Sequence, residues 1–139
     1  MRRVAYCFKH GVHERFGQAA TPCQDQFKSS KMKNANIFVD VDMTLIDANG
    51  RLRDGAADAL VKMRDKGCHL FLWSTNGADY ARRVAKINGL EMLFEGFSAK
   101  PDIIIDDMPG AALNPFVFDV NAETSWPSLA DKIIRKHID

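Results

Sequence analysis

The sequence lacks the features that define several classes of protein. Its 139 residues contain three cysteines, an odd number that cannot all pair within one chain, so a disulfide scaffold is disfavoured and a reducing compartment is favoured. No apolar stretch approaches the ~20 residues of a membrane span, and the charged first residues lack the apolar core of a secretory signal. We therefore expect a cytoplasmic protein with no membrane partner.

The chain also lacks a strong charge of either sign, because 19 Lys/Arg and 18 Asp/Glu give a net charge of +1. The charges are unevenly distributed: residues 1–31 hold six bases and two acids, and the remainder holds 13 bases and 16 acids. We interpret residues 1–33 as a basic, flexible N-terminal arm, with contact to a nucleic acid or another anionic partner as the alternative.

Two features of this arm are left open by the sequence. The first is a set of possible ligands for a structural metal: Cys7, His10, His13 and Cys23. Their spacing matches no familiar zinc pattern, so an incidental cluster is the simpler interpretation. The second is whether translation starts at Met1 or at Met32; a start at Met32 would remove the arm.

Residues 34–139 alternate between apolar β-branched runs and amphipathic stretches, which predicts a single domain. Strands are expected at 36–41, 69–73, 94–97, 103–105 and 116–118. Helices are expected at 55–66, at 78–88 and from Pro127, capped by Asp54 and Ser125 where the first and last begin, and Asn49-Gly50 suits a tight hairpin turn. This alternation predicts an α/β fold, a Rossmann-like three-layer sandwich with a central parallel sheet.

Polar residues follow the predicted strands at the points where they end. In chain order these are Asp40 and Asp42, then Ser74 and Thr75, then Lys100, then Asp106 and Asp107. The carboxyl ends of parallel strands meet at one edge of a sheet, so we expect these side chains to share one crevice.

Such a group predicts phosphate chemistry. Clustered carboxylates stay ionised together only around a cation, and an all-oxygen ligand set favours Mg²⁺. The metal and Lys100 would bind a phosphate, and a carboxylate held against phosphorus can act as a nucleophile and form an aspartyl-phosphate. A second acid two residues later, Asp42, can protonate the leaving group and later activate water.

Four segments resemble the motifs of the haloacid dehalogenase (HAD) superfamily: DVDMTL (Asp40 to Leu45), Ser74 after an apolar strand, Lys100-Pro101, and IIIDD (Ile103 to Asp107). The resemblance spans residues 36–137 and implies a Mg²⁺-dependent phosphatase. It implies that Asp40 is the nucleophile and a metal ligand, and that Asp42 is the acid/base and a metal ligand through its carbonyl. Lys100 and one hydroxyl would bind the phosphoryl group; Ser74 is favoured as this hydroxyl because it directly follows Trp73, and Thr75 is the alternative. Asp106 would hold Mg²⁺, with Asp107 as a direct or water-mediated supporter.

The sequence departs from the family's pattern in one residue and in one spacing. Met43 stands where the family often has glycine, and Lys100 lies unusually close to Asp106. One helical unit fills each gap between motifs, so the resemblance implies a member without a cap domain and with an open site. Such a site suits large phosphorylated substrates, or it takes a lid from a neighbouring subunit of a homo-oligomer.

Two other functions compete with a phosphatase. One is a phosphate- or partner-binding module that kept the fold and lost turnover, which Met43 and the short spacing after Lys100 favour. The other is a receiver-like signalling domain, which also uses an acidic pocket, Mg²⁺ and a lysine. The receiver is disfavoured because its phosphorylated aspartate follows a later strand, whereas Asp40 ends the first strand here.

Overall fold

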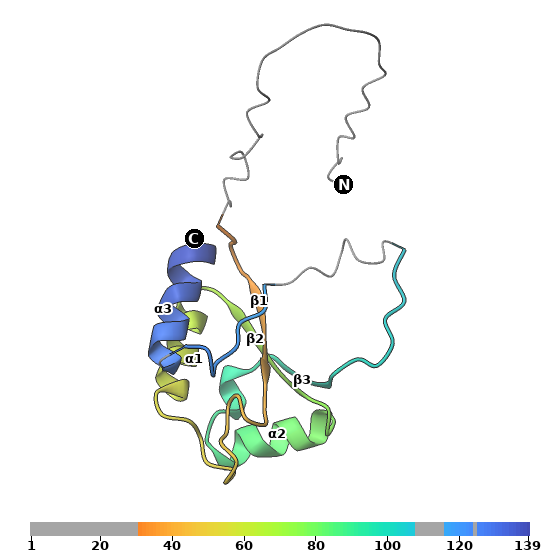
Figure 1. Cartoon of the computed structure of the whole chain (residues 1–139). Helices are drawn as coiled ribbons and strands as arrows, with labels where there is room; N and C mark the ends of the chain where they lie inside the picture. Colours follow the sequence, from red (N-terminus) through yellow and green to blue (C-terminus); the bar gives the residue numbers. More distant parts are fainter. Residues whose placement is uncertain (1–30, 108–115, 124) are drawn as a thin grey trace, which may run out of the picture.

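The structure is a computed structural model that describes residues 31–107, 116–123 and 125–139. Its strands form one parallel sheet in the order β1-β2-β3: β1 (Asn36–Asp40), β2 (His69–Ser74) and β3 (Gly96–Ala99). Helices flank this sheet (Figure 1): α1 (Ala56–Asp65), α2 (Ala78–Ile87), the short 3-10 helix η1 (Glu91–Leu93) and α3 (Trp126–His137). The predicted α/β class is confirmed, and the arrangement is compatible with a Rossmann-like sandwich.

The two faces of the sheet differ in how deeply their side chains are buried. Val39, Leu70 and Leu72 are buried on one face, and both α1 and α2 contact β2. Because side chains alternate along a strand, Phe38 and Trp73 belong to the opposite face. Their rings lie 5.0 Å apart, and Phe38 is 49% exposed. The hydrophobic core therefore lies mainly between the sheet and its helices.

Helix α1 begins differently from the prediction. Asp54 was expected to cap it, but the N-cap position is taken by Gly55, and no side chain bonds the helix start there. Gly55 has a φ of +74°, and a Cβ at this position would lie 2.7 Å from Cδ of Pro127 on α3. The left-handed conformation and the close approach of α3 both require glycine at this position.

Helix α3 agrees with the prediction and joins the two ends of the described domain. Ser125 caps it, because its Oγ accepts a hydrogen bond from the main-chain N of Ser128 at 3.3 Å. At its other end, the main-chain N of Met32 donates to the carbonyl of His137 at 2.6 Å, and Asp139 N donates to the Met32 carbonyl at 3.0 Å. Two main-chain hydrogen bonds therefore tie Met32 to the C-terminal end of α3.

A small hairpin, residues 45–53, follows β1 and is called the flap below; its turn lies at Asn49-Gly50, as predicted. Gly50 has a φ of +75°, and its main-chain N donates to the carbonyl of Asp47 at 3.0 Å. The Asp47 carboxylate accepts main-chain bonds from Asn49 at 2.8 Å and from Arg51 at 3.0 Å, and the N–H of Arg51 is among the groups that lower the pKa of Asp47. These contacts close a tight turn at the tip of the flap.

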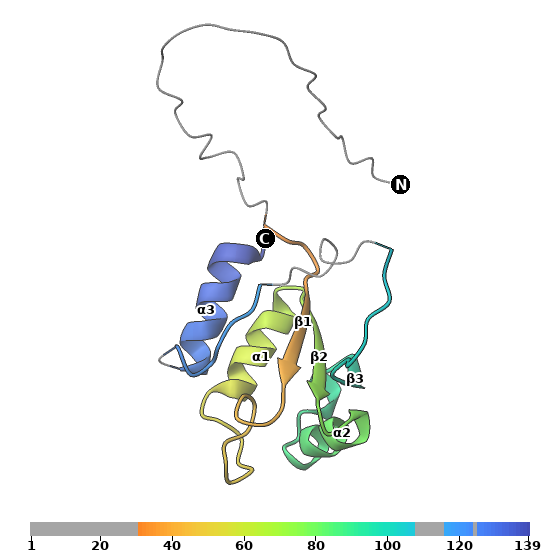
Figure 2. The ribbon, with the colours of Figure 1, turned by 45° about the vertical axis from the view of Figure 1, so that its right-hand side comes forward.

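The predicted strand at 103–105 is wrong. The segment after β3 has no regular secondary structure, and it leaves the sheet in both ribbon views (Figures 1 and 2). The side chains of Ile103 and Ile105 are 82% and 96% exposed. Only residues 100–102 separate β3 from this segment, whereas a further parallel strand needs a crossover of about a dozen residues. The apolar composition was right for a strand, but the connection is too short to place one.

The predicted strand at 116–118 is also wrong. These residues have no regular secondary structure, and Phe116 and Val117 are 62% and 86% exposed. They run beside α3 instead, where the rings of Phe116 and Phe118 lie 4.3 Å and 5.6 Å from the His137 ring. The two aromatic residues that indicated a strand here lie against the end of a helix, and Val117 between them faces solvent.

The N-terminal arm lies almost entirely outside the described residues, and so does its group of Cys7, His10, His13 and Cys23. Within the residues that are described, no helix is long and apolar enough to cross a membrane.

Candidate active site at the carboxyl ends of the strands

Asp40 is the last residue of β1 and the centre of the candidate site. Its Oδ1 lies 2.9 Å from Nζ of Lys100, and its Oδ2 accepts a hydrogen bond from Oγ1 of Thr44 at 3.1 Å. The Asp40 side chain is 28% exposed, so a ligand can reach it from solvent. The predicted meeting of Asp40 and Lys100 is therefore found in the structure.

Lys100 reaches Asp40 across the middle strand. Its main-chain N donates to the carbonyl of Ser74 at 3.0 Å, which fixes Lys100 directly after β3 and beside the end of β2. Its ammonium lies 5.9 Å from the centre of the Trp73 ring, and Trp73 is the register partner of Asp40. The cation therefore lies against an aromatic face while it pairs with the carboxylate.

Asp42 lies in the loop after β1. Its carboxylate is held by one side chain from the turn after β2 and by one from α2. Tyr80 OH donates to its Oδ1 at 2.6 Å, and Asn76 Nδ2 donates to its Oδ2 at 3.2 Å. The hydrogen bond to Asp42 is the main cause that raises the pKa of Tyr80, with burial and the charge of Asp42 adding to it and Arg83 opposing it. Both oxygens of this carboxylate therefore have a hydrogen-bond donor.

The loop that joins Asp40 to the flap has an unusual backbone conformation at Met43. Met43 has a φ of +60°, which only a few per cent of non-glycine residues adopt. Nη1 of Arg53 donates to the Met43 carbonyl at 3.1 Å, and Trp126 Nε1 donates to the Thr44 carbonyl at 3.0 Å. The flap and α3 thus hold the loop in the shape that separates Asp40 from Asp42.

The two hydroxyl candidates after β2 have different environments. Ser74 is fully buried, and its Oγ accepts a hydrogen bond from the main-chain N of Asn76 at 3.0 Å. Thr75 is exposed. Ser74 thus shapes the turn into α2, and a ligand at this edge of the sheet would meet the Thr75 side chain first.

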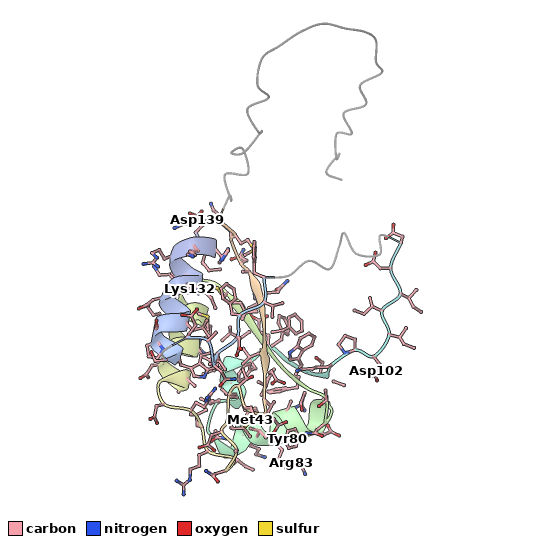
Figure 3. All side chains as sticks on the ribbon, viewed as in Figure 1. Met43, Tyr80, Arg83, Asp102, Lys132 and Asp139 are labelled. Atoms are coloured by element: carbon pink, nitrogen blue, oxygen red, sulfur yellow. The ribbon has the colours of Figure 1, made fainter. Side chains whose placement is uncertain are left out.

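Asp106 and Asp107 do not join the other carboxylates. They belong to the exposed segment that follows β3, and Figure 3 shows Asp102, near the start of this segment, apart from Met43 and Tyr80. Among the residues that are described, no three His, Cys, Asp or Glu side chains lie close enough to hold a metal ion. The structure therefore pairs Lys100 with Asp40, and the loop that follows Asp40 carries Asp42, but Asp106 and Asp107 form no carboxylate cluster with them among the described residues.

A hollow of about 430 Å³ lies behind the flap, apart from the candidate site. Its walls include Asp47 and Arg53 from the flap and Asn121 from the segment before α3. Nη2 of Arg53 donates to Oδ1 of Asn121 at 3.0 Å across it. The hollow contains neither Asp40 nor Asp42, and its contacts hold the flap in place.

Sequence reasoning missed the residues that orient the two carboxylates. Thr44 lies within the DVDMTL segment, so its closeness to Asp40 along the chain was visible in the sequence. Asn76 directly follows the hydroxyl pair, which is a weaker signal. Tyr80 has no such signal, because an aromatic residue at helical spacing with Val84 resembles a core position of α2.

Comparison of the chain with protein-family models, with curated proteins and with solved structures finds no match. The function therefore has to be argued from the residues of the site.

Proposed function

We propose that the protein is a Mg²⁺-dependent phosphatase of the HAD type, a phosphomonoester hydrolase that works through an aspartyl-phosphate. One observation carries the proposal: Asp40 ends β1, pairs with Lys100 at 2.9 Å, and has a second carboxylate, Asp42, two residues further on. A nucleophile, a cation for the phosphoryl group and an acid/base are the three groups that this reaction requires of the protein.

Asp40 is the proposed nucleophile. One of its oxygens forms a bond to phosphorus as the bond from phosphorus to the leaving oxygen breaks, which leaves an acyl phosphate on Asp40. Thr44 fixes the carboxylate from one side and Lys100 from the other. Lys100 also offsets the repulsion between the Asp40 carboxylate and an incoming phosphate, both of which are negative.

Asp42 is the proposed acid/base. In the first half of the reaction it gives its proton to the leaving alkoxide. In the second half it takes a proton from the water that attacks phosphorus, the bond between phosphorus and Asp40 breaks, and inorganic phosphate leaves. Asp42 ends the cycle protonated, as it began.

The donor chemistry of this loop fits Mg²⁺. The ion commonly takes one or two carboxylates together with waters and substrate phosphate oxygens. Asp40, through its carboxylate, and Asp42, through its main-chain carbonyl, would hold it. When bound, Mg²⁺ supplies positive charge to the phosphoryl oxygens as the bond order changes. A role for Asp106 and Asp107 stays a prediction of the sequence, and it requires residues 101–107 to turn back toward Asp40.

Thr75 and Lys100 are the proposed phosphate-binding side chains, and Ser74 supports them from beneath. The support is the exposure of Thr75 and the burial of Ser74. A phosphoryl group at Asp40 would then contact β1, β2 and β3 at the same time, one residue from each strand end.

We propose that the substrate is large or that a second copy of the chain closes the site. Residues 42–74 contain only the flap, α1 and β2. Residues 74–100 contain only α2, η1 and β3, so neither connection has room for a cap domain. The three-layer sandwich of the HAD type is part of the same proposal. The described helices and strands make up only part of that fold.

A binding module without turnover is the second candidate function. Asp42 has both oxygens engaged by Tyr80 and Asn76, and the described residues do not supply a third carboxylate to the site. Such a site would bind a phosphorylated partner through Lys100 and Thr75 without cleaving it.

Hydrolysis of p-nitrophenyl phosphate separates the two functions. The phosphatase requires release of nitrophenol that depends on Mg²⁺, is abolished by chelation and is lost in Asp40→Asn. Asp47→Asn, a carboxylate at the flap tip, is the matched control and should keep full activity. Folded wild-type protein that binds phosphate but releases no nitrophenol with Mg²⁺ would favour the binding module.

A further inference from the structure

Tyr80 has a polar contact that its place on a helix does not require. It lies in the first turn of α2, one turn before the buried residue Val84, where a purely apolar side chain would serve packing equally well. Its hydroxyl instead lies 2.6 Å from Oδ1 of Asp42, and Figure 3 shows Tyr80 at the same end of the sheet as Met43. A hydrogen bond to a carboxylate is about twice as strong as one between neutral groups.

Asn76 completes the arrangement from the other side. Its amide nitrogen lies 3.2 Å from Oδ2 of Asp42, so one carboxylate oxygen is held from the connection between β2 and α2 and the other from α2 itself. Two anchored oxygens define the plane of a carboxylate and prevent rotation about χ2. Each oxygen keeps a second lone pair for a proton, because a carboxylate has about four acceptor sites.

We infer that Tyr80 is a positioning residue for the acid/base Asp42, and that it aims the carboxyl group at the leaving oxygen of the substrate. The inference rests on the proposed function. A tyrosine hydroxyl both donates and accepts hydrogen bonds. Tyr80 can therefore donate to the ionised carboxylate and accept from the protonated one, whereas the Asn76 amide nitrogen only donates. Asn76 assists by holding the second oxygen.

This role makes a prediction that packing alone does not make. General-acid assistance matters little for a leaving group that departs as a stable anion, and much for a basic one. A variant in which Asp42 is poorly aimed should therefore lose more activity toward phenyl phosphate than toward p-nitrophenyl phosphate. The two esters have similar shape, so a loss of packing or of substrate binding would affect both equally.

The test compares kcat/KM for both esters in wild type, Tyr80→Phe, Asp42→Asn and the double variant. For Tyr80→Phe we expect the loss on phenyl phosphate to exceed the loss on p-nitrophenyl phosphate by about tenfold, part of the 10²–10⁴ that a general acid contributes. In the Asp42→Asn background, Tyr80→Phe should have no further effect on either ester, because Tyr80 acts through Asp42.

Equal losses on the two esters, or an undiminished effect in the Asp42→Asn background, would overturn the inference and leave the phosphatase intact. Wild-type protein that hydrolyses neither ester would overturn the phosphatase itself. Asn76→Ala, at an exposed turn position, carries the same comparison if Tyr80→Phe fails to fold, and we expect the same bias against phenyl phosphate at a smaller size.

Discussion

The Lys100 ammonium pairs with the Asp40 carboxylate at 2.9 Å although the two residues follow strands that are not neighbours. Lys100 follows β3, Asp40 ends β1, and the Trp73 ring of β2 lies beneath the lysine at 5.9 Å from its Nζ. The side chain thus spans the whole carboxyl edge of the sheet. This span makes the pair a sensitive reporter of how the three strands are placed.

Lys100→Met should lower kcat/KM for a phosphate ester by about 10² or more, the loss typical of removing one charge-stabilising donor. The free energy of unfolding should change by less than about 1 kcal/mol, because the side chains of Lys100 and Asp40 are both partly exposed. Lys86→Met, an exposed lysine on α2, should leave kcat/KM unchanged. Steady-state kinetics and urea unfolding of both variants check this, and a kinetic loss of the same size in Lys86→Met would contradict the role of Lys100.

Ser74→Ala should lower stability, whereas Thr75→Ala should weaken substrate binding. Ser74→Ala removes the acceptor of a partly buried hydrogen bond from the main-chain N of Asn76 and should lower the free energy of unfolding by about 1 kcal/mol. Thr75→Ala should leave stability within about 0.5 kcal/mol and raise KM, because an exposed hydroxyl is lost. Urea unfolding and KM values distinguish them, and a raised KM confined to Ser74→Ala would assign phosphate binding to Ser74.

The Tyr80 hydroxyl should ionise only above the ordinary tyrosine pKa of about 10, since its hydrogen bond to Asp42 raises this pKa. The stability that the hydrogen bond from Tyr80 to Asp42 contributes is then fully present below about pH 10. It is lost as the pH rises through the raised pKa of Tyr80. The absorbance of tyrosinate, taken as wild type minus Tyr80→Phe, isolates it from Tyr6. Asp42→Asn should shift this titration to lower pH, and an unchanged titration would deny the contact.

Met43→Gly should raise the free energy of unfolding by up to about 1 kcal/mol. A left-handed conformation costs a residue with a Cβ about 1–2 kcal/mol, and the greater freedom of glycine in the unfolded chain cancels part of that gain. Met92→Gly is the matched control, because Met92 is 89% exposed and lies outside the left-handed region. It should lose about 0.5–1 kcal/mol. Urea unfolding that shows equal losses in both would contradict strain at Met43.

Local patterns in the sequence were sufficient to predict most of the fold. The apolar runs at β1 and β2, the Asn49-Gly50 turn and the Ser125 cap depend on neighbouring residues and were predicted correctly. The isoleucines at 103–105 have the same local signal, but their position depends on the length of the connection before them. That length is visible in the sequence and is too short for a parallel crossover, so the strand prediction failed because it rested on apolar composition alone.

The site divides in the same way. Asp40, Asp42 and Lys100 follow strands whose ends meet in any parallel sheet, so the sequence was enough to bring them together. Tyr80 reaches Asp42 only because of how α2 packs on β2 and β3, which no spacing along the chain reveals. Asp106 and Asp107 were expected at the site on the basis of a strand that does not form, and their role stays a prediction.

The phosphorylated residue itself tests the central claim most directly. Asp42→Asn, supplied with Mg²⁺ and p-nitrophenyl phosphate, should accumulate the acyl phosphate, because a good leaving group needs no acid while the second step has lost its base. Acid quenching and peptide mass spectrometry should then find one phosphoryl group on Asp40, and none in Asp40→Asn. A phosphoryl group on another residue, or wild-type turnover that persists in Asp40→Asn, would contradict the account.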